Sequence, residues 1–239
     1  MAYTKSSPDT IQKLFSKIAS RYDLCNKALS FNLHKGWNKK LVKTLLTSGE
    51  PHQILDLCAG TGDIAFELKR ALPHHKEITL LDFCKPMLDV AKTKAEAEGT
   101  VSSFTFIEGD ATKLPFEKEI FSHISIAYGI RNVEDPLKCI HEAYRVLQKG
   151  GSFGILELTR PKNSFMRAFH SLYLKFFVPV IGGFVTEINV TSPTGIREIE
   201  AIHRLRQMSK TEEFGKALAK AGEDKLDSAV DLVSDPIGT

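Results

Sequence analysis

The sequence predicts an α/β fold with a doubly wound, mainly parallel sheet of the Rossmann-like type. Short apolar segments alternate with segments of helical period, which is typical of βα units. A glycine-rich turn closes the first apolar segment, and open α/β sheets bind ligands at such a place. We therefore expect a single domain with this core, flanked by helical segments.

Two helices with an irregular stretch between them are expected in the first fifth of the chain. Residues 9–22 place apolar side chains at steps of three and four, which predicts an amphipathic helix. The pattern loosens over residues 22–37, so we expect an irregular, aromatic-rich stretch there. It would form either a wall or lid of a site, or a connector over the core. A further helix is expected over residues 37–46.

Strands and helices then alternate. The strand candidates are short apolar runs at 53–58, 77–83, 104–110, 121–127 and 151–158. The helix candidates have helical period, and the second carries a proline near its first position; they are residues 63–71, 86–98 and 136–147. This order predicts a parallel sheet that is covered on both faces.

Composition excludes several classes of protein. The chain has 239 residues, of which 42% are hydrophobic, enough to fill a core. A net charge of +3 without a long Lys/Arg run does not indicate nucleic-acid binding. The four cysteines form no CxxC pair, so we expect neither a metal site nor a disulfide scaffold. The N-terminus lacks the apolar stretch of a signal peptide, which favours a cytoplasmic protein.

The glycine turn is the first candidate binding element. Gly60 and Gly62 allow a ligand to approach the backbone closely, and the following helix presents free N–H groups. With Ala65, and with Asp82 placed 20 residues after Gly62, the segment also satisfies the dinucleotide fingerprint. NAD is therefore a competing ligand.

Charge favours a different ligand. A pyrophosphate binds best at a helix N-terminus without nearby carboxylates, but Asp56 and Asp63 flank this turn. S-adenosylmethionine carries an ammonium and a sulfonium group that carboxylates attract, and a ribose that Asp82 could hold. Asp63 alternatively stabilises the start of its helix. Asp110 and Ala111 follow the third strand, where a carboxylate could accept the amino group of adenine.

These residues resemble the class I S-adenosylmethionine-dependent methyltransferases, and among them the UbiE-type quinone C-methyltransferases, which include demethylmenaquinone methyltransferases. The resemblance covers roughly residues 10–186. Five motifs carry it: LDLCAGTGDIAFEL (55–68), LLDFCKPML (80–88), GDATKLPF (109–116), YGIRNVEDPLKCIHEAYRVLQKGG (128–151) and ILELTRPKN (155–163). The turn is common to many methyltransferases, whereas the segment 129–132 is far more restricted.

The resemblance implies S-adenosyl-L-methionine as the cofactor. The implied contacts are Thr61, Asp82, Asp110 and Ala111, and the residues that shape the turn are Asp56, Gly60 and Gly62. Position 127 departs from the family, which has a cofactor-contacting serine where this chain has alanine. The chain after residue 186 departs further, because the family ends there with a strand pair that completes a seven-stranded sheet.

The implied reaction is C-methylation of a prenylated quinol ring, most simply demethylmenaquinol to menaquinol in menaquinone biosynthesis. Arg131 would stabilise the phenolate that develops on the ring or orient a basic water, because a guanidinium is a poor base. Asn132 would bind a quinol oxygen, and Tyr128 would line the ring. The alternative for Arg131 is a salt bridge to a neighbouring acidic residue, Glu134 or Asp135.

Other roles and readings stay open at this point. His34 and Tyr22 are secondary candidates for handling protons. The substrate could be a benzoquinol of ubiquinone biosynthesis or another small molecule, and a quinone-binding subunit without turnover is the non-enzymatic reading.

Partners and organisation follow from the same motifs. An apolar stripe over 165–181 could form the entrance for a prenyl tail or contact the inner face of the membrane; alternatively it faces the core or a homodimer partner. We expect one methyltransferase domain with an N-terminal helical cover (1–49), a cofactor-binding core (50–160) and a substrate cover with an atypical tail (161–239).

Overall fold

The structure, a computed structural model, describes residues 8–49, 51–74 and 77–157. Within these residues five strands form one sheet in the order β3-β2-β1-β4-β5, and every neighbouring pair is parallel. The strands are β1 (Ile54–Leu57), β2 (Ile78–Asp82), β3 (Phe104–Glu108), β4 (Phe121–Ala127) and β5 (Leu147–Leu156). The predicted parallel, doubly wound α/β fold is confirmed.

Three helices connect the strands as predicted: α4 (Asp63–Ala71), α5 (Lys85–Ala97) and α6 (Pro136–Val146). Local sequence explains where two of them begin. A proline occupies the first turn of α5. The carboxylate of Asp135 accepts a hydrogen bond from the backbone N–H of Lys138 and caps α6.

The N-terminal segment differs from the prediction. Helix α1 (Pro8–Ile18) continues through a 3₁₀ turn, η1 (Ala19–Arg21), into α2 (Tyr22–Ser30), and α3 (Leu33–Leu45) follows. The expectation of an irregular stretch over 22–37 is therefore wrong. Phe31 and Asn32, both with positive φ, separate α2 from α3, and within α2 only Cys25 is buried. A helix that buries so little shows no clear apolar period.

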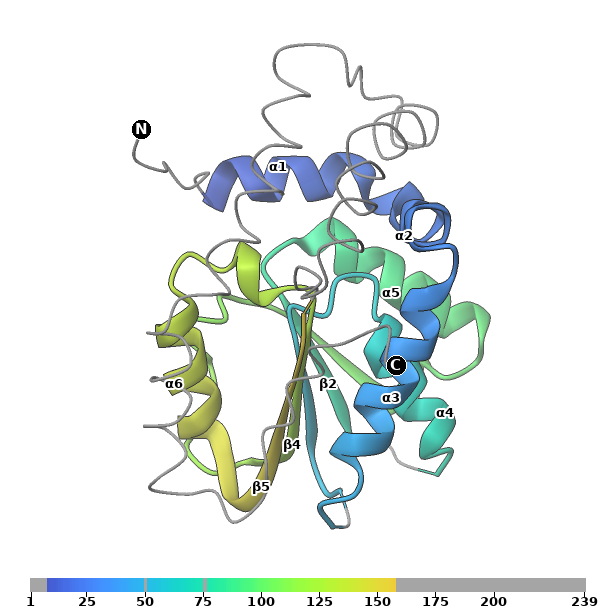
Figure 1. Ribbon diagram of the computed structural model, residues 1–239. Coiled ribbons are helices and arrows are strands. Elements are labelled where there is room, and N and C mark those ends of the chain that lie inside the picture. The colour runs from blue at the N-terminus through green and yellow to red at the C-terminus, as the bar shows by residue number, and fades with distance from the viewer. Residues whose placement is uncertain (1–7, 50, 75–76, 158–239) are drawn as a thin grey trace, which may run out of the picture.

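Helices cover both faces of the sheet (Figure 1). Helix α6 lies on one face, whereas α3, α4 and α5 lie on the other. Consecutive side chains of β1 point to opposite faces of the sheet: Ile54 packs in the core under α3 and α4, and Leu55 packs in the core under α6. Both side chains are fully buried. This two-sided burial explains why the strands read as continuous apolar runs.

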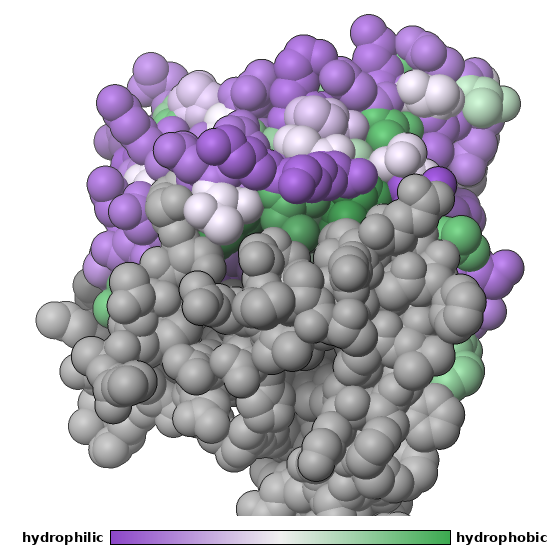
Figure 2. Space-filling view, turned by 90° about the horizontal axis from the view of Figure 1, so that it is seen from above, coloured by the Kyte–Doolittle hydropathy of each residue, from purple (hydrophilic) through white to green (hydrophobic). Residues whose placement is uncertain are grey.

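The order of the strands creates a switch point beside β1. From β1 the chain continues to β2 and β3 on one side, and later returns to β4 and β5 on the other side. A crevice therefore opens where the carboxyl ends of β1 and β4 diverge. Helix α1 lies across this end of the sheet, with α2 beside it (Figure 1). Seen from this end, the described surface is largely hydrophilic and has a group of hydrophobic side chains near its centre (Figure 2).

Some sequence predictions lie outside the described residues. They are the substrate cover (161–239), its apolar stripe (165–181) and the departure from the family after residue 186. The final strand pair of a seven-stranded sheet would also lie there.

Candidate active site

A cavity of about 220 Å³ lies at the carboxyl ends of the strands, at the switch point. One wall comes from the glycine turn and from the ends of β2 and β3, and it includes Gly60, Asp82 and Asp110. The opposite wall comes from the segment after β4 and includes Tyr128 and Asn132. The sequence motifs therefore meet in one cavity although they lie far apart along the chain.

The glycine turn needs a left-handed backbone at two positions. Gly60 and Gly62 have φ values of +55° and +84°. A Cβ atom at Gly62 would also lie 2.9 Å from the Phe66 ring. Gly62 is the residue before α4, so this turn points the start of the helix toward the ligand side of the sheet. The turn therefore favours glycine at both positions, and at Gly62 a side chain would also collide with Phe66.

Asp82 joins the turn to the next loop. Its carboxylate accepts hydrogen bonds from the backbone N–H of Gly60 and of Cys84, each at 2.8 Å. Burial raises the pKa of Asp82 to about 6, and these backbone bonds oppose the increase. The carboxylate is thus mostly ionised at neutral pH and lines the cavity, where it can accept hydrogen bonds from a diol.

Asp110 and Ala111 both line the cavity after β3. The Asp110 carboxylate accepts hydrogen bonds from the backbone N–H and the hydroxyl of Thr112, both at 2.8 Å. This local turn fixes the direction of the carboxylate. Ala111 is buried beside it. A polar acceptor next to an apolar wall suits a flat heterocycle with an amino group.

The other two acidic residues of the turn region lie outside the cavity lining. Asp56 is buried within β1, where its carboxylate accepts a hydrogen bond from the Ser125 hydroxyl at 2.8 Å. Burial raises the pKa of Asp56 to about 7. Asp63 forms an ion pair with Lys94. Only Asp82 and Asp110, of the four carboxylates that the sequence grouped around a cationic cofactor, reach the cavity.

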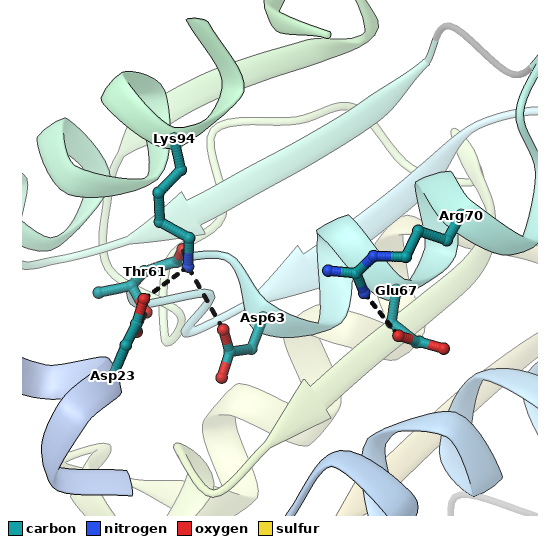
Figure 3. Close-up of polar contacts among 6 residues, drawn as sticks. All are labelled: Asp23, Thr61, Asp63, Glu67, Arg70 and Lys94. Atoms are coloured by element: carbon teal, nitrogen blue, oxygen red, sulfur yellow. Dashed lines mark hydrogen bonds and ion pairs between the residues drawn. The ribbon is translucent and has the colours of Figure 1, made fainter. Parts of the chain in front are cut away.

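Thr61 also points away from the cavity lining. Its side chain is buried, and its hydroxyl donates a hydrogen bond to Asp23 at 2.5 Å (Figure 3). The prediction that Thr61 contacts the cofactor stays a prediction, and its hydroxyl is committed to Asp23 in this structure. The position of Thr61 instead links the turn to helix α2.

The wall after β4 holds the residues that we expected to meet the substrate. Tyr128 has a φ of +58°, and its hydroxyl donates to the Asn38 side chain at 3.1 Å. Burial raises the pKa of the Tyr128 hydroxyl. A Cβ atom on Gly129 would overlap the Cβ of Cys58, so only glycine fits between this segment and the turn. Asn132 lines the cavity within the 3₁₀ turn η3 (Ile130–Asn132).

Arg131 forms an ion pair with Glu157, a residue that the sequence analysis did not suggest. Its guanidinium binds the carboxylate of Glu157, which is buried just after β5. The alternative of a salt bridge to Glu134 or Asp135 stays a prediction. Arg131 precedes Asn132 in the chain, but it is not part of the cavity lining itself. The sequence analysis missed Glu157, because this contact joins the segment after β4 to the residue after β5, which lies 26 residues further along the chain.

The two secondary candidates differ in their positions. His34 is buried, and its Nδ1 is 2.5 Å from the Ser30 hydroxyl; burial lowers its pKa. It is not part of the cavity lining. Tyr22 does line the cavity, and burial raises the pKa of its hydroxyl, which keeps the hydroxyl protonated at neutral pH. Phe15 of α1 also lines the cavity. The sequence analysis did not single it out, because its one signal was its place in an amphipathic helix.

Comparison with known proteins agrees with this geometry. Residues 3–222 match the model of the ubiE/COQ5 methyltransferase family. The chain is 45% identical over 185 residues to a demethylmenaquinone methyltransferase of Protochlamydia amoebophila, covering 77% of this chain and 76% of the relative. It is 40% identical over 183 residues to the protein of that name from Chlamydia caviae, covering 76% of each.

A solved structure supports the fold. A protein from Methanococcus maripaludis, described as a candidate S-adenosyl-L-methionine-dependent methyltransferase, superposes with a TM-score of 0.61. The superposition covers 97% of this chain and 92% of that protein, at 18% sequence identity. At this identity the likeness concerns the fold alone.

Proposed function

Because this chain belongs to the ubiE/COQ5 methyltransferase family and is an S-adenosylmethionine-dependent methyltransferase, we propose that it methylates a ring carbon of demethylmenaquinol to give menaquinol. The observation that carries the proposal is the two-walled cavity, which combines Asp82 and Asp110 on one side with Asn132 on the other. The relatives named demethylmenaquinone methyltransferase favour a naphthoquinol over a benzoquinol.

The residues of the first wall fit S-adenosylmethionine, which supplies an activated methyl group on a positively charged sulfur. Each Asp82 carboxylate oxygen accepts one backbone N–H and keeps capacity for a ribose hydroxyl. Asp110 would accept a hydrogen bond from the amino group of adenine, beside the apolar Ala111. The negative charge of both carboxylates also favours a cationic ligand over a pyrophosphate.

The residues of the second wall would hold and activate the acceptor ring. A ring carbon becomes a nucleophile as the neighbouring hydroxyl loses its proton, so the site must stabilise negative charge on that oxygen. Arg131 would supply this charge, because a guanidinium has five N–H donors and Glu157 holds it in place. Asn132 would donate to a quinol oxygen, and the Tyr128 ring, fixed through Asn38, would limit the position of the acceptor.

Incubation with methyl-labelled cofactor tests this function. Short-chain demethylmenaquinol and its benzoquinol counterpart are supplied separately, and the products are analysed by mass spectrometry. We expect labelled methyl on the naphthoquinol ring carbon. Product from the benzoquinol alone would contradict the choice of substrate, and absence of product from both would contradict quinol methylation.

We also propose peripheral contact with the inner face of the cytoplasmic membrane, because a prenyl tail resides in a bilayer. No helix in the described ranges is long and apolar enough to cross a membrane. Leu24 in the first turn of α2 and Leu33 at the start of α3 are more than half exposed, and five lysines but no acidic residue occupy positions 24–49. Such a surface suits anionic lipid.

Flotation with anionic and zwitterionic liposomes measures this contact. We expect binding to anionic liposomes only, and weaker binding after Leu33→Ser. Leu137→Ser is a matched control, because Leu137 is exposed on α6, on the other side of the sheet. Equal flotation of all three proteins, or no flotation at all, would refute this surface.

The organisation of the chain is a related proposal. We infer one methyltransferase domain, with 1–49 and 161–239 covering the core at 50–160, and the family match over residues 3–222 supports a single unit. A homodimer stays a prediction that sedimentation velocity can test.

A further inference from the structure

Four residues from four parts of the chain meet beside the glycine turn (Figure 3). The Lys94 ammonium, on α5, donates to the Asp23 carboxylate of α2 at 2.8 Å and to the main-chain oxygen of Thr61 at 2.9 Å. It also lies 3.4 Å from a carboxylate oxygen of Asp63, the first residue of α4. The Thr61 hydroxyl donates to the other Asp23 oxygen, which closes the network.

This network is more than one surface ion pair. The side chains of Lys94 and Asp23 are 28% and 43% exposed, so water screens each single contact in part. However, the ammonium makes three polar contacts and lies 5.0 Å from the centroid of the Phe66 ring. Thr61 is almost completely buried, and both its hydroxyl and its carbonyl group are committed to this network. The conformation of the turn therefore depends on it.

The network also connects two parts of the cavity lining, α2 and the glycine turn. Asp23 directly follows Tyr22, which lines the cavity from α2, and Thr61 directly follows Gly60, which lines it from the turn. Loss of the Asp23 contacts would remove the hydrogen bonds that hold α2 against the turn, beside Tyr22 and Gly60. Helix α1 has a separate attachment, because the Gln12 side chain donates to the main-chain oxygen of Phe83 at 2.9 Å.

We propose that Lys94 and Asp23 are positioning residues for cofactor binding. Lys94 holds the turn through the Thr61 carbonyl and holds α2 through Asp23, so that the wall containing Tyr22 closes on the ligand side of the turn. The two residues act through Thr61 and Tyr22. This inference rests on the cofactor part of the proposed function and is independent of the identity of the acceptor.

Isothermal titration with S-adenosylmethionine tests the proposal in the full chain. We expect Lys94→Met and Asp23→Asn each to raise the Kd about tenfold, and the double variant to bind about as weakly as either single variant. Lys94→Arg should recover most of the affinity, because a guanidinium can reach two carboxylates. Equal Kd values for wild type and folded Lys94→Met, or additive effects in the double variant, would refute the coupling.

Two controls come from neighbouring ion pairs. Lys85→Met removes an exposed pair with Asp89 on the same helix, and Arg70→Met removes the pair with Glu67 on α4 (Figure 3). Both should keep the Kd within about twofold of wild type. A tenfold change in either control would attribute the effect to general surface charge and overturn the proposal.

Hydrogen exchange distinguishes positioning from a merely structural role. We expect backbone amides of residues 22–30 to exchange faster in Lys94→Met while amides of the sheet stay protected. Uniformly faster exchange in the sheet would refute the local role. If Lys94→Met does not fold, the same measurements on Asp23→Asn test the proposal, because asparagine keeps the side-chain size and one acceptor oxygen. Wild type that binds the cofactor but methylates no quinol would contradict the proposed substrate and leave this inference intact.

Discussion

Replacing Asp56 by asparagine should change how the stability of the protein depends on pH. The carboxylate lies in the central strand β1, is 1% exposed, and accepts a hydrogen bond from Ser125. Burial outweighs this bond and a bond from the Ala65 backbone, and raises the pKa of Asp56 from 3.8 to about 7. Asparagine keeps the size of the side chain and an acceptor for Ser125, but it does not titrate.

The sign and size of the effect follow from proton linkage. Between pH 3.8 and about 7 the folded protein holds a proton at Asp56 that the unfolded chain has lost. Stability therefore falls as pH rises through this window, and it stops falling above the folded pKa. For the two pKa values given, the loss from about pH 5 to about pH 8 is about 2 to 3 kcal/mol, and Asp56→Asn should lack it.

Urea unfolding of the cofactor-free protein at these two pH values measures the difference. Comparison of the pH dependence, instead of the stability at one pH, cancels any fixed effect of the amide on packing. Asp89→Asn is the matched control, since its carboxylate lies on the exposed side of α5, and it should follow wild type. Equal losses of stability in wild type and Asp56→Asn would refute the argument that burial perturbs this carboxylate.

Three further substitutions test the site and the turn. Arg131→Ala should reduce turnover by about 10²–10³ while the cofactor Kd measured by titration stays within about twofold, and near-normal turnover would remove Arg131 from the mechanism. Gly62→Ala should lower the free energy of unfolding by about 2 kcal/mol or more, because φ is positive and the new Cβ meets Phe66; thermal melting checks this. Gly129→Ala should weaken cofactor binding, because the new Cβ overlaps that of Cys58. Adding Cys58→Gly should restore binding, since glycine removes that Cβ and suits the φ of +52° at this position; a double variant that binds no better than Gly129→Ala would contradict this.

The sheet and its helices could be predicted because their signals are local. Each strand overlaps a short segment rich in apolar residues, and α4, α5 and α6 each show an apolar period. The α2 segment lacked such a signal because it buries little more than Cys25. The helix ends at Ser30, and Phe31 follows in a left-handed conformation that is uncommon for an aromatic residue, so Asn32 alone signalled the turn.

The candidate site was predictable to the extent that it consists of motifs at strand ends. Asp82, Asp110 and Asn132 were expected at one edge of the sheet, and they line one cavity there. The pairings were not predictable, because they join residues distant in sequence. Lys94 lies 71 residues from Asp23, and no spacing rule connects them.

In the proposed reaction, the arrangement of the sheet assigns the methyl donor and the acceptor ring to separate stretches of the chain. Cavity residues on the donor side come from 58–111 beyond β1 to β3, whereas those on the acceptor side include 128–134 beyond β4. Exchanging segment 128–134 with that of a relative acting on a different ring should therefore alter what is methylated while the methyl source is unchanged. The same separation lets acceptor choice diverge by mutation in one stretch without disturbing the other.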